Sequence, residues 1–250
     1  QLSFGSALAH GLLDAQRQKI SQAIPELQHA DQLRRLLYPS NAYLAAKIRI
    51  NLTDLILRDG RTQEAAALLT RTLTDPMFAE GRIGGIYTSA LQLNLARALR
   101  NLGRFNEALP LAQAAVARSE KILGPNEYQT LVQMSTLSGI HENAGNCQKA
   151  LDSMRIVQKR MSDHFGAEKQ ATIVETGNLA SQEFDCGDRG KAVGLMRDVI
   201  AILQKQDGGT ENVHSQVCRY ELAGMLRQMR RHDEALRPLD GLTAKLLPPA

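Results

Sequence analysis

The sequence predicts an all-α superhelix of stacked helix hairpins, and three observations lead to this fold class. The chain of 250 residues has only 4% aromatic residues and no tryptophan, so residue types that favour strands are sparse. A short pattern recurs about every 42 residues along most of the chain. Each recurrence carries two stretches with the apolar spacing of amphipathic helices. Hairpins that recur in this way bury their apolar faces by stacking on one another.

The repeated pattern is anchored on an alanine, and the steps between successive alanines are 43, 42, 42 and 43 residues. The alanines are Ala65, Ala108, Ala150, Ala192 and Ala235. The residue five places earlier is Gly60, Gly103, Gly145, Gly187 or, in the last unit, Arg230. A leucine stands thirteen places earlier, at Leu52, Leu95, Leu137, Leu179 and Leu222. A small residue follows each leucine and lets two helices approach closely, so we expect all five leucines to be buried.

Each unit contains two predicted helices, as the segment 86–127 illustrates. Leu91, Leu95 and Leu99 are four residues apart and form the apolar stripe of the first helix. Gly103 is expected to end this helix, because glycine tolerates the left-handed conformation of a helix terminus. A second helix begins at 105 or 106, with alanines on its apolar face. Together the two helices form a hairpin.

The repeat also sets the expected domain organisation. Five hairpins are predicted at about 43–85, 86–127, 128–169, 170–212 and 213–247, within one continuous domain that spans 43–250. Residues 1–42 fit the pattern less well. We expect them to form a degenerate helical hairpin that caps the stack, with Pro25 breaking between its two helices. The stretch 75–85 is predicted to be a loop within the domain.

These residues resemble the tetratricopeptide repeat. The resemblance rests on NLA at 94–96 and 178–180, on the recurring glycine, and on EA at 64–65, 107–108 and 234–235. The long step and the linker LGPNEYQTL at 123–131 resemble the kinesin-light-chain subclass, which also occurs in bacterial signalling and regulatory proteins. His141 and Glu183 depart from the pattern, because the family usually has an aromatic residue there.

The sequence lacks the common motifs of catalytic and phosphate-binding sites. It contains no phosphate-binding loop, no zinc-protease motif and no hydrolase nucleophile motif. We therefore expect no catalytic residue, cofactor or metal ion, and we interpret the chain as not an enzyme. The net charge of +4 is scattered, so direct binding of nucleic acid is not expected. No apolar run is long enough to cross a membrane.

The resemblance implies a binding groove on the concave face made by the first helices. In that family, the residue fourteen places before the alanine faces the groove, and an asparagine there holds a peptide backbone. The candidate groove residues are Asn51, Asn94, Asn178, Lys47, Asp54, Arg58, Arg97 and Arg100. The alternative is that the asparagines are solvated helix residues. Because the cations belong to the first two repeats, the expected partner is a protein or peptide segment with acidic groups.

Two cysteines are predicted to lie at the same end of the stack. Cys147 begins the second helix of the third hairpin, and Cys186 ends the first helix of the fourth. A disulfide between them can form only if their Cα atoms lie within about 7 Å. It would indicate an oxidising compartment such as the bacterial periplasm, whereas free thiols would fit the cytoplasm. A buried free thiol is the alternative for Cys147, and Cys218 is expected in the core.

The function that these expectations favour is a non-catalytic protein- or peptide-binding module. The chain lacks an initiator methionine, and we interpret it as a fragment or a processed product. The resemblance implies the sensor or scaffold region of a larger bacterial signalling or transcription-regulatory protein. The alternatives are a structural element that self-assembles into a homodimer, and an accessory domain of an enzyme whose catalytic part lies elsewhere.

Overall fold

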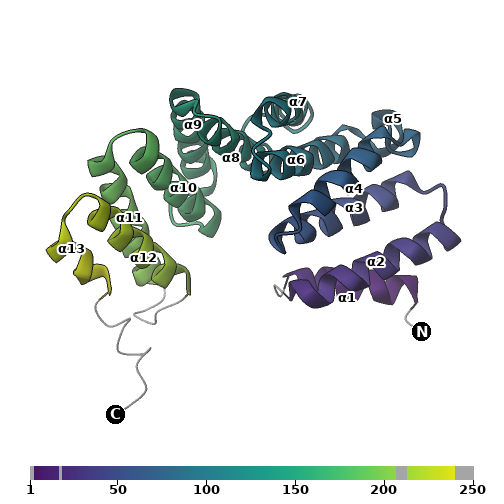
Figure 1. Cartoon of the computed structure of the whole chain (residues 1–250), viewed down its shortest axis with the longest axis horizontal. Helices are drawn as coiled ribbons and strands as arrows, with labels where there is room; N and C mark the ends of the chain where they lie inside the picture. The colour runs from purple at the N-terminus through teal and green to yellow at the C-terminus, as the bar shows by residue number, and fades with distance from the viewer. Residues whose placement is uncertain (1–2, 17–18, 207–212, 240–250) are drawn as a thin grey trace, which may run out of the picture. The chain divides into compact units, whose positions relative to one another are not determined.

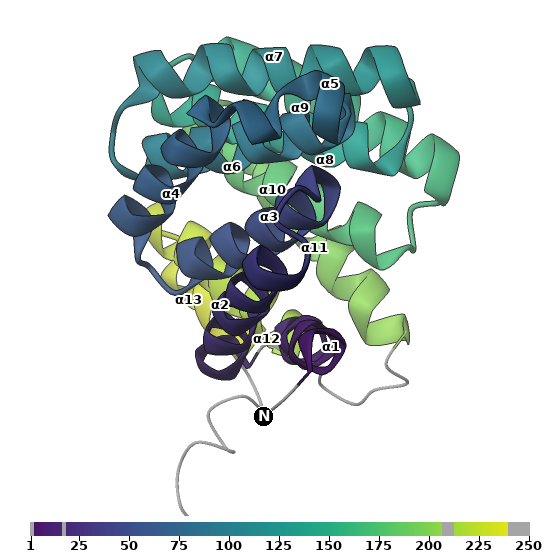
Figure 2. The same cartoon turned by 90° about the vertical axis from the view of Figure 1, so that its right-hand side faces the viewer.

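The computed structural model describes residues 3–16, 19–206 and 213–239, and in these residues the regular secondary structure is helical. The chain divides into two compact units, Gln1–Ala144 and Gly145–Ala250. Within each unit the helices run back and forth as hairpins (Figures 1 and 2). The boundary between the units falls inside the third expected hairpin, so a single continuous domain over 43–250 stays a prediction.

The first unit consists of a helical cap and the first helix pairs of the repeat. Its α-helices are α1 (Phe4–Gln16), α2 (Ile20–Leu37), α3 (Ala42–Arg58), α4 (Thr62–Thr74), α5 (Glu80–Ile83), α6 (Gly85–Asn101), α7 (Phe105–Leu123) and α8 (Tyr128–Asn143). The pairs α1–α2, α3–α4 and α6–α7 pack as hairpins. The first helices also contact one another, α3 with α6 and α6 with α8, which is the contact expected of stacked repeats.

The cap is a helix pair, but its break does not lie at Pro25. Helix α1 ends at Gln16 and α2 begins at Ile20, so Pro25 lies inside α2 and the expected position of the break is wrong. Ala23, Ile24 and Leu27 flank the proline and are buried. Their tertiary packing holds the helix on both sides of the residue that lacks an N–H donor, although proline disfavours a helix interior.

The stretch 75–85 is more ordered than the loop that we expected. It contains a 3₁₀-helix, η1 (Pro76–Phe78), and the short helix α5. The carboxylate of Asp75 accepts a hydrogen bond from the N–H of Met77 and starts the first turn. Phe78 and Ile83 are buried in the core of the first unit. These two side chains anchor the connection, so it lies within the unit and not at a boundary.

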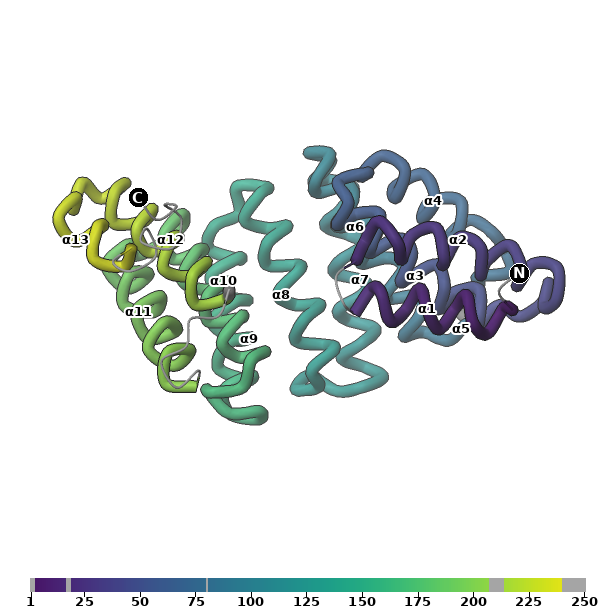
Figure 3. Tube along the Cα trace, turned by 90° about the horizontal axis from the view of Figure 1, so that it is seen from below, coloured from purple at the N-terminus to yellow at the C-terminus, as the bar shows by residue number. Residues whose placement is uncertain are grey.

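The second unit is a run of helices in which each packs on the next. They are α9 (Cys147–Phe165), α10 (Gln170–Cys186), α11 (Arg189–Gln206), α12 (Val213–Gln228), α13 (His232–Leu236) and the 3₁₀-helix η2 (Arg237–Leu239). The contacts are α9 with α10, α10 with α11, α11 with α12 and α12 with α13 (Figure 3). The pairs α10–α11 and α12–α13 coincide with the fourth and fifth predicted hairpins.

The register predicted for the core is confirmed with one exception. Leu52, Leu95, Leu179 and Leu222 are buried, whereas Leu137 is only partly buried. Leu137 lies on α8, the last helix of the first unit, and its side chain packs against the core of that unit. The small residues after the leucines and the anchoring alanines are all buried: Thr53, Ala96, Ser138, Ala180, Ala223, Ala65, Ala108, Ala150, Ala192 and Ala235.

The turn inside the last hairpin keeps the repeat geometry although its glycine is missing. Gly103 has a φ of +74°, and Arg230, at the same place in the fifth repeat, has a φ of +59°. The N–H that follows each of them bonds a carbonyl five residues back, from Arg104 to Leu99 and from Arg231 to Leu226. An arginine therefore adopts the left-handed conformation that costs a residue with a Cβ atom about 1–2 kcal/mol.

We expect Arg230→Gly to raise the free energy of unfolding by about 1 kcal/mol, because glycine adopts positive φ without this steric cost. Urea denaturation followed by circular dichroism measures the change. Ala201→Gly is the matched control, since Ala201 is exposed on α11 and glycine inside a helix should cost about 1 kcal/mol. A loss of stability in Arg230→Gly similar to the loss in the control would contradict the assigned backbone conformation.

Candidate ligand-binding site

A cavity of about 250 Å³ opens among the first helices of the first unit. We call the surface formed by α3, α6 and α8 the first-helix face (Figure 1). The cavity is lined by Lys47, Ile50, Asn51, Ile86, Tyr87, Ala90 and Gln129. Since the hairpins stack in register, residues about one repeat apart, such as Tyr87 and Gln129, come together on this face.

Two tyrosines form the aromatic edge of this site. The rings of Tyr43 and Tyr87 pack edge to face with their centroids 4.8 Å apart, and the Tyr87 hydroxyl donates to the Tyr43 hydroxyl at 2.8 Å. This hydrogen bond and, to a smaller extent, burial raise the pKa of Tyr87. Tyr43, Lys47 and Asn51 are spaced four residues apart on α3, so they line one side of that helix.

The three predicted asparagines have different environments. Asn51 is partly exposed and donates to the carbonyl of Lys47 in its own helix at 2.8 Å. Asn178 belongs to the second unit, is exposed, and donates to Glu175 at 3.0 Å. Asn94 is only 6% exposed, so the expectation that it projects from a groove wall is wrong.

Asn94 is buried because its amide joins two neighbouring hairpins. Its Nδ2 atom donates to the carbonyl of Ile50 and to the hydroxyl of Thr53 on α3, both at 3.1 Å. The hydroxyl of Thr53 in turn donates to the carbonyl of Arg49 at 2.7 Å. A buried amide with partners of this kind stabilises the contact between α3 and α6, since an unpaired amide in this place would be costly.

Some of the charged residues predicted for the groove interact with other charged side chains of the protein. Arg97 donates to Asp54 at 2.6 Å, so these two side chains largely neutralise each other across α6 and α3. Burial lowers the pKa of Arg100, the positive charge of Arg97 lowers it further, and Glu142 opposes both. Lys47 and Arg58 are exposed on α3. Of the four cationic residues predicted for the groove, Lys47 is the one among the lining residues of the cavity.

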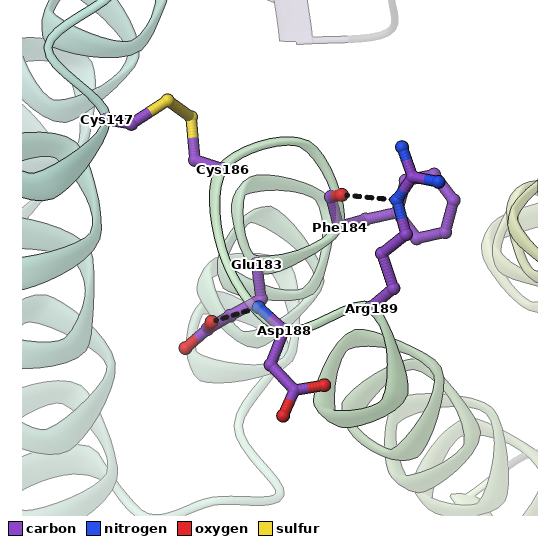
Figure 4. Close-up of a disulfide and its surroundings, with 6 residues drawn as sticks. All are labelled: Cys147, Glu183, Phe184, Cys186, Asp188 and Arg189. Carbon is purple, nitrogen blue, oxygen red and sulfur yellow. Dashed lines mark hydrogen bonds between the residues drawn. A yellow bond between two sulfur atoms is a disulfide. The ribbon is translucent and has the colours of Figure 1, made fainter.

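The second unit contains the predicted cysteine pair. A disulfide joins Cys147, the first residue of α9, to Cys186, the last residue of α10, with a Cα–Cα distance of 5.2 Å (Figure 4). The chain between the two cysteines folds back on itself, so the bond closes the α9–α10 pair at one end. The thiol of Cys218 is free and partly buried, and burial raises its pKa.

A buried carboxylate lies beside the disulfide. Glu183 is inaccessible to solvent and accepts hydrogen bonds from Arg155 at 3.0 Å and from Lys191 at 2.8 Å. The N–H of Asp188 also donates to it (Figure 4). Burial opposes ionisation of Glu183, but the hydrogen bonds from Lys191 and Arg155 outweigh this effect and lower its pKa. Ionic contacts to α9 and α11 therefore replace the aromatic packing usual at this position.

The comparisons with known proteins identify the repeat. Residues 87–155 match the model of the tetratricopeptide repeat family. The match to the tetratricopeptide repeat covers these 69 residues, which hold the second predicted hairpin and part of the third. The kinesin light chain repeats of Podosopora anserina are similar in fold, with a TM-score of 0.65 and 22% identity over 85% of this chain and all of that one. No curated protein sequence gives a significant match.

Two further solved structures show the same fold at low sequence identity. BtubC (BKLC) from P. vanneervenii has a TM-score of 0.68 and 15% identity, and the match covers 95% of this chain and 94% of that one. A Rap protein complexed with the competence and sporulation factor has a TM-score of 0.70 and 11% identity, over 96% of this chain and 74% of that one. These matches confirm the predicted all-α fold of stacked helix hairpins, and one of the similar folds is that of kinesin light chain repeats.

Sequence reasoning missed the aromatic part of the site. Tyr43 and Tyr87 lie near the starts of α3 and α6, but they are 44 residues apart, one more than the step between Ala65 and Ala108. When positions are counted from Ala65 and Ala108, the two tyrosines therefore do not align with each other. A search for exposed aromatic residues near the start of each first helix would have found the pair.

The described residues contain no grouping that suits a metal ion, since no three histidine, cysteine or acidic side chains lie close enough together. His214 and Cys218 are four residues apart on α12, but a third such side chain does not join them in the part of the chain that the structure describes. None of the helices in that part combines the length and the apolar character needed to cross a membrane.

Proposed function

We propose that these tetratricopeptide repeats form a non-catalytic interaction module that binds a protein or peptide segment on the first-helix face. The observation that carries this proposal is the cavity in which Lys47, Asn51 and Gln129 lie beside Tyr87. Concave sites with apolar walls and a few polar groups are typical ligand sites. The Rap protein of similar fold is bound to the competence and sporulation factor, which supports ligand binding by such repeats.

The side chains suit an extended segment with an acidic residue. The amides of Asn51 and Gln129 can each donate to a carbonyl and accept from an N–H, so they match a peptide backbone. An apolar side chain of the segment packs against Tyr87 and Ile86, because both line the cavity. Lys47 attracts a carboxylate, and this attraction weakens as salt screens it.

The wider setting that we infer is the sensor or scaffold region of a larger bacterial signalling or transcription-regulatory protein. The long repeat step, which resembles that of bacterial regulators, supports this setting. The disulfide between Cys147 and Cys186 supports an oxidising compartment such as the periplasm, because such bonds persist there and are reduced in the cytoplasm.

The test of the binding face is selection of 12-residue peptides from a phage-displayed library with the 250-residue chain, followed by titration of each selected peptide by fluorescence anisotropy. Lys47→Glu and Tyr87→Ala should each weaken binding by about 1–3 kcal/mol, because the ligand loses a charge partner or an aromatic contact. Neither substitution should unfold the protein, since Lys47 is exposed and Tyr87 is partly exposed.

Arg71→Glu is the matched control, because Arg71 is exposed on the second helix α4 and the charge change resembles that of Lys47→Glu. Selected peptides should bind this variant as tightly as the unmodified chain. Peptides that lose affinity for Arg71→Glu but keep it for Lys47→Glu and Tyr87→Ala would place the ligand elsewhere. Failure to select any peptide would also count against the proposal.

A further inference from the structure

A pocket of about 420 Å³ lies on the last helix pair of the second unit, formed by α12 and α13. This pair lies at the end of the unit away from α9 (Figures 1 and 3). Tyr220 and Arg227 line the pocket from α12, whereas Asp233 and Leu236 line it from α13. Tyr220 is 46% exposed and Leu236 is 66% exposed, so two large hydrophobic side chains face solvent here. We call the surface made by these four residues the terminal face.

The position of Leu236 is one that the other repeats bury. The residue after the anchoring alanine is Ala66, Leu109, Leu151 or Val193 in the first four repeats. Ala66, Leu151 and Val193 are buried, and Leu109 is partly buried against the core of the first unit. In that unit a further helix packs on each helix pair, since α6 contacts both α3 and α4, and α8 contacts both α6 and α7. Leu236 thus belongs to a stacking surface that no helix covers in the part of the chain that the structure describes.

The exposed hydrophobic residues of the terminal face indicate an interaction surface. The last repeat of a stack usually has a polar outer face, because this face meets water instead of another repeat. Tyr220 and Leu236 depart from this expectation and line the same pocket. Hydrophobic side chains that gather on a surface and are rimmed by polar residues are typical of a site that binds another protein chain.

The charges of the terminal face are suited to a surface that carries the same two charges. Arg227 and Asp233 are exposed and line the pocket from different helices. Neither of them forms an ion pair with a residue that the structure describes, whereas the neighbouring Arg231 and Glu234 pair with each other at 2.7 Å. The face therefore offers one cation and one anion, and a second face of the same kind can pair with both.

We propose that the terminal face binds the terminal face of a second copy of this chain in a symmetric dimer. In a two-fold interface the same surface meets itself, so Arg227 of each copy pairs with Asp233 of the other. Tyr220 and Leu236 of both copies then pack together. Removal of these side chains from water provides the affinity, and the two ion pairs fix the orientation. This surface lies in the second unit, so the proposal does not depend on the first-helix face.

The test is sedimentation velocity of the full chain over a range of concentrations, where the mass should rise from that of a monomer to that of a dimer. Arg227→Asp and Asp233→Arg each place like charges at both contacts, so each should weaken the dimer about tenfold or more. Both residues are exposed, so neither substitution should unfold the chain. An equimolar mixture of the two variants should recover the affinity of the unmodified chain, because a mixed dimer has opposite charges at both contacts.

Two further variants separate the terminal face from other surfaces. Leu236→Ser should weaken the dimer, whereas Arg71→Glu changes an exposed charge on α4 and should leave it unchanged. A chain that stays monomeric at every concentration would overturn the proposal, as would a mixture of Arg227→Asp and Asp233→Arg that does not recover the dimer. Growth of the mass beyond that of a dimer would indicate head-to-tail assembly through other surfaces and would also overturn it.

Discussion

A variant with asparagine in place of Asp31 is expected to lose about 3–5 kcal/mol of unfolding free energy. The Asp31 carboxylate is buried and accepts hydrogen bonds from Arg34 at 3.1 Å, from Arg35 at 3.1 Å and from Arg49 at 2.8 Å. Arg34 and Arg49 are themselves buried. Asparagine keeps the size of the side chain but removes its charge, so two guanidinium groups remain buried without their counter-charge.

The environment of Arg49 supports this expectation. Burial lowers its pKa, the charge of Asp31 opposes this change, and the charges of Arg35 and Arg34 add to the effect of burial. Asp31 lies on α2 and Arg49 on α3, so their contact joins the helical cap to the first repeat. Loss of the carboxylate should therefore loosen residues 1–42 first, and limited proteolysis should cut there before the rest of the first unit.

Urea denaturation of the full chain measures the loss in Asp31→Asn. Arg35→Gln is the control, because Arg35 binds the same carboxylate but its side chain is 61% exposed. This exposed pair should contribute less than about 1 kcal/mol. If both substitutions lowered the free energy of unfolding by the same small amount, the buried arginines would not need the negative charge of Asp31, contrary to this prediction.

Loss of the disulfide is expected to have the second large effect. The bond between Cys147 and Cys186 has a sequence separation of 39 residues, and closing a loop of this length restricts the unfolded chain by up to about 4 kcal/mol. Cys147→Ser should lower the free energy of unfolding of the second unit toward this limit. The ion pairs of Glu183 with Arg155 and Lys191 remain in the variant, so we expect α9 and α10 to stay helical.

Denaturation with and without dithiothreitol checks this expectation. The unmodified chain and Cys218→Ser should both lose stability when the reductant is added, whereas Cys147→Ser should not respond to it. Intact mass after trapping of free thiols gives an independent measurement. One trapped thiol per chain is expected for protein from an oxidising compartment, and three would contradict the native bond.

The sequence by itself determined the repeat fold, because its signals are local and recur at a constant step. The leucine and the small residue after it appear in every unit, as expected if each unit folds into the same kind of closely packed helix pair. The same register placed Cys147 and Cys186 at the same end of two antiparallel helices. It also indicated Lys47 and Asn51, since residues four places apart on α3 must share one side of the helix.

Only the tertiary structure decided how individual polar and aromatic side chains are used. Asn94 has the same register as Asn51, but a carbonyl and a hydroxyl of α3 bind its amide and bury it. The pairing of Tyr43 with Tyr87 and the helix that continues through Pro25 likewise depend on neighbouring elements. These environments depend on hydrogen bonds and packing between segments that are distant in the sequence. A local sequence pattern does not show which of those segments come together.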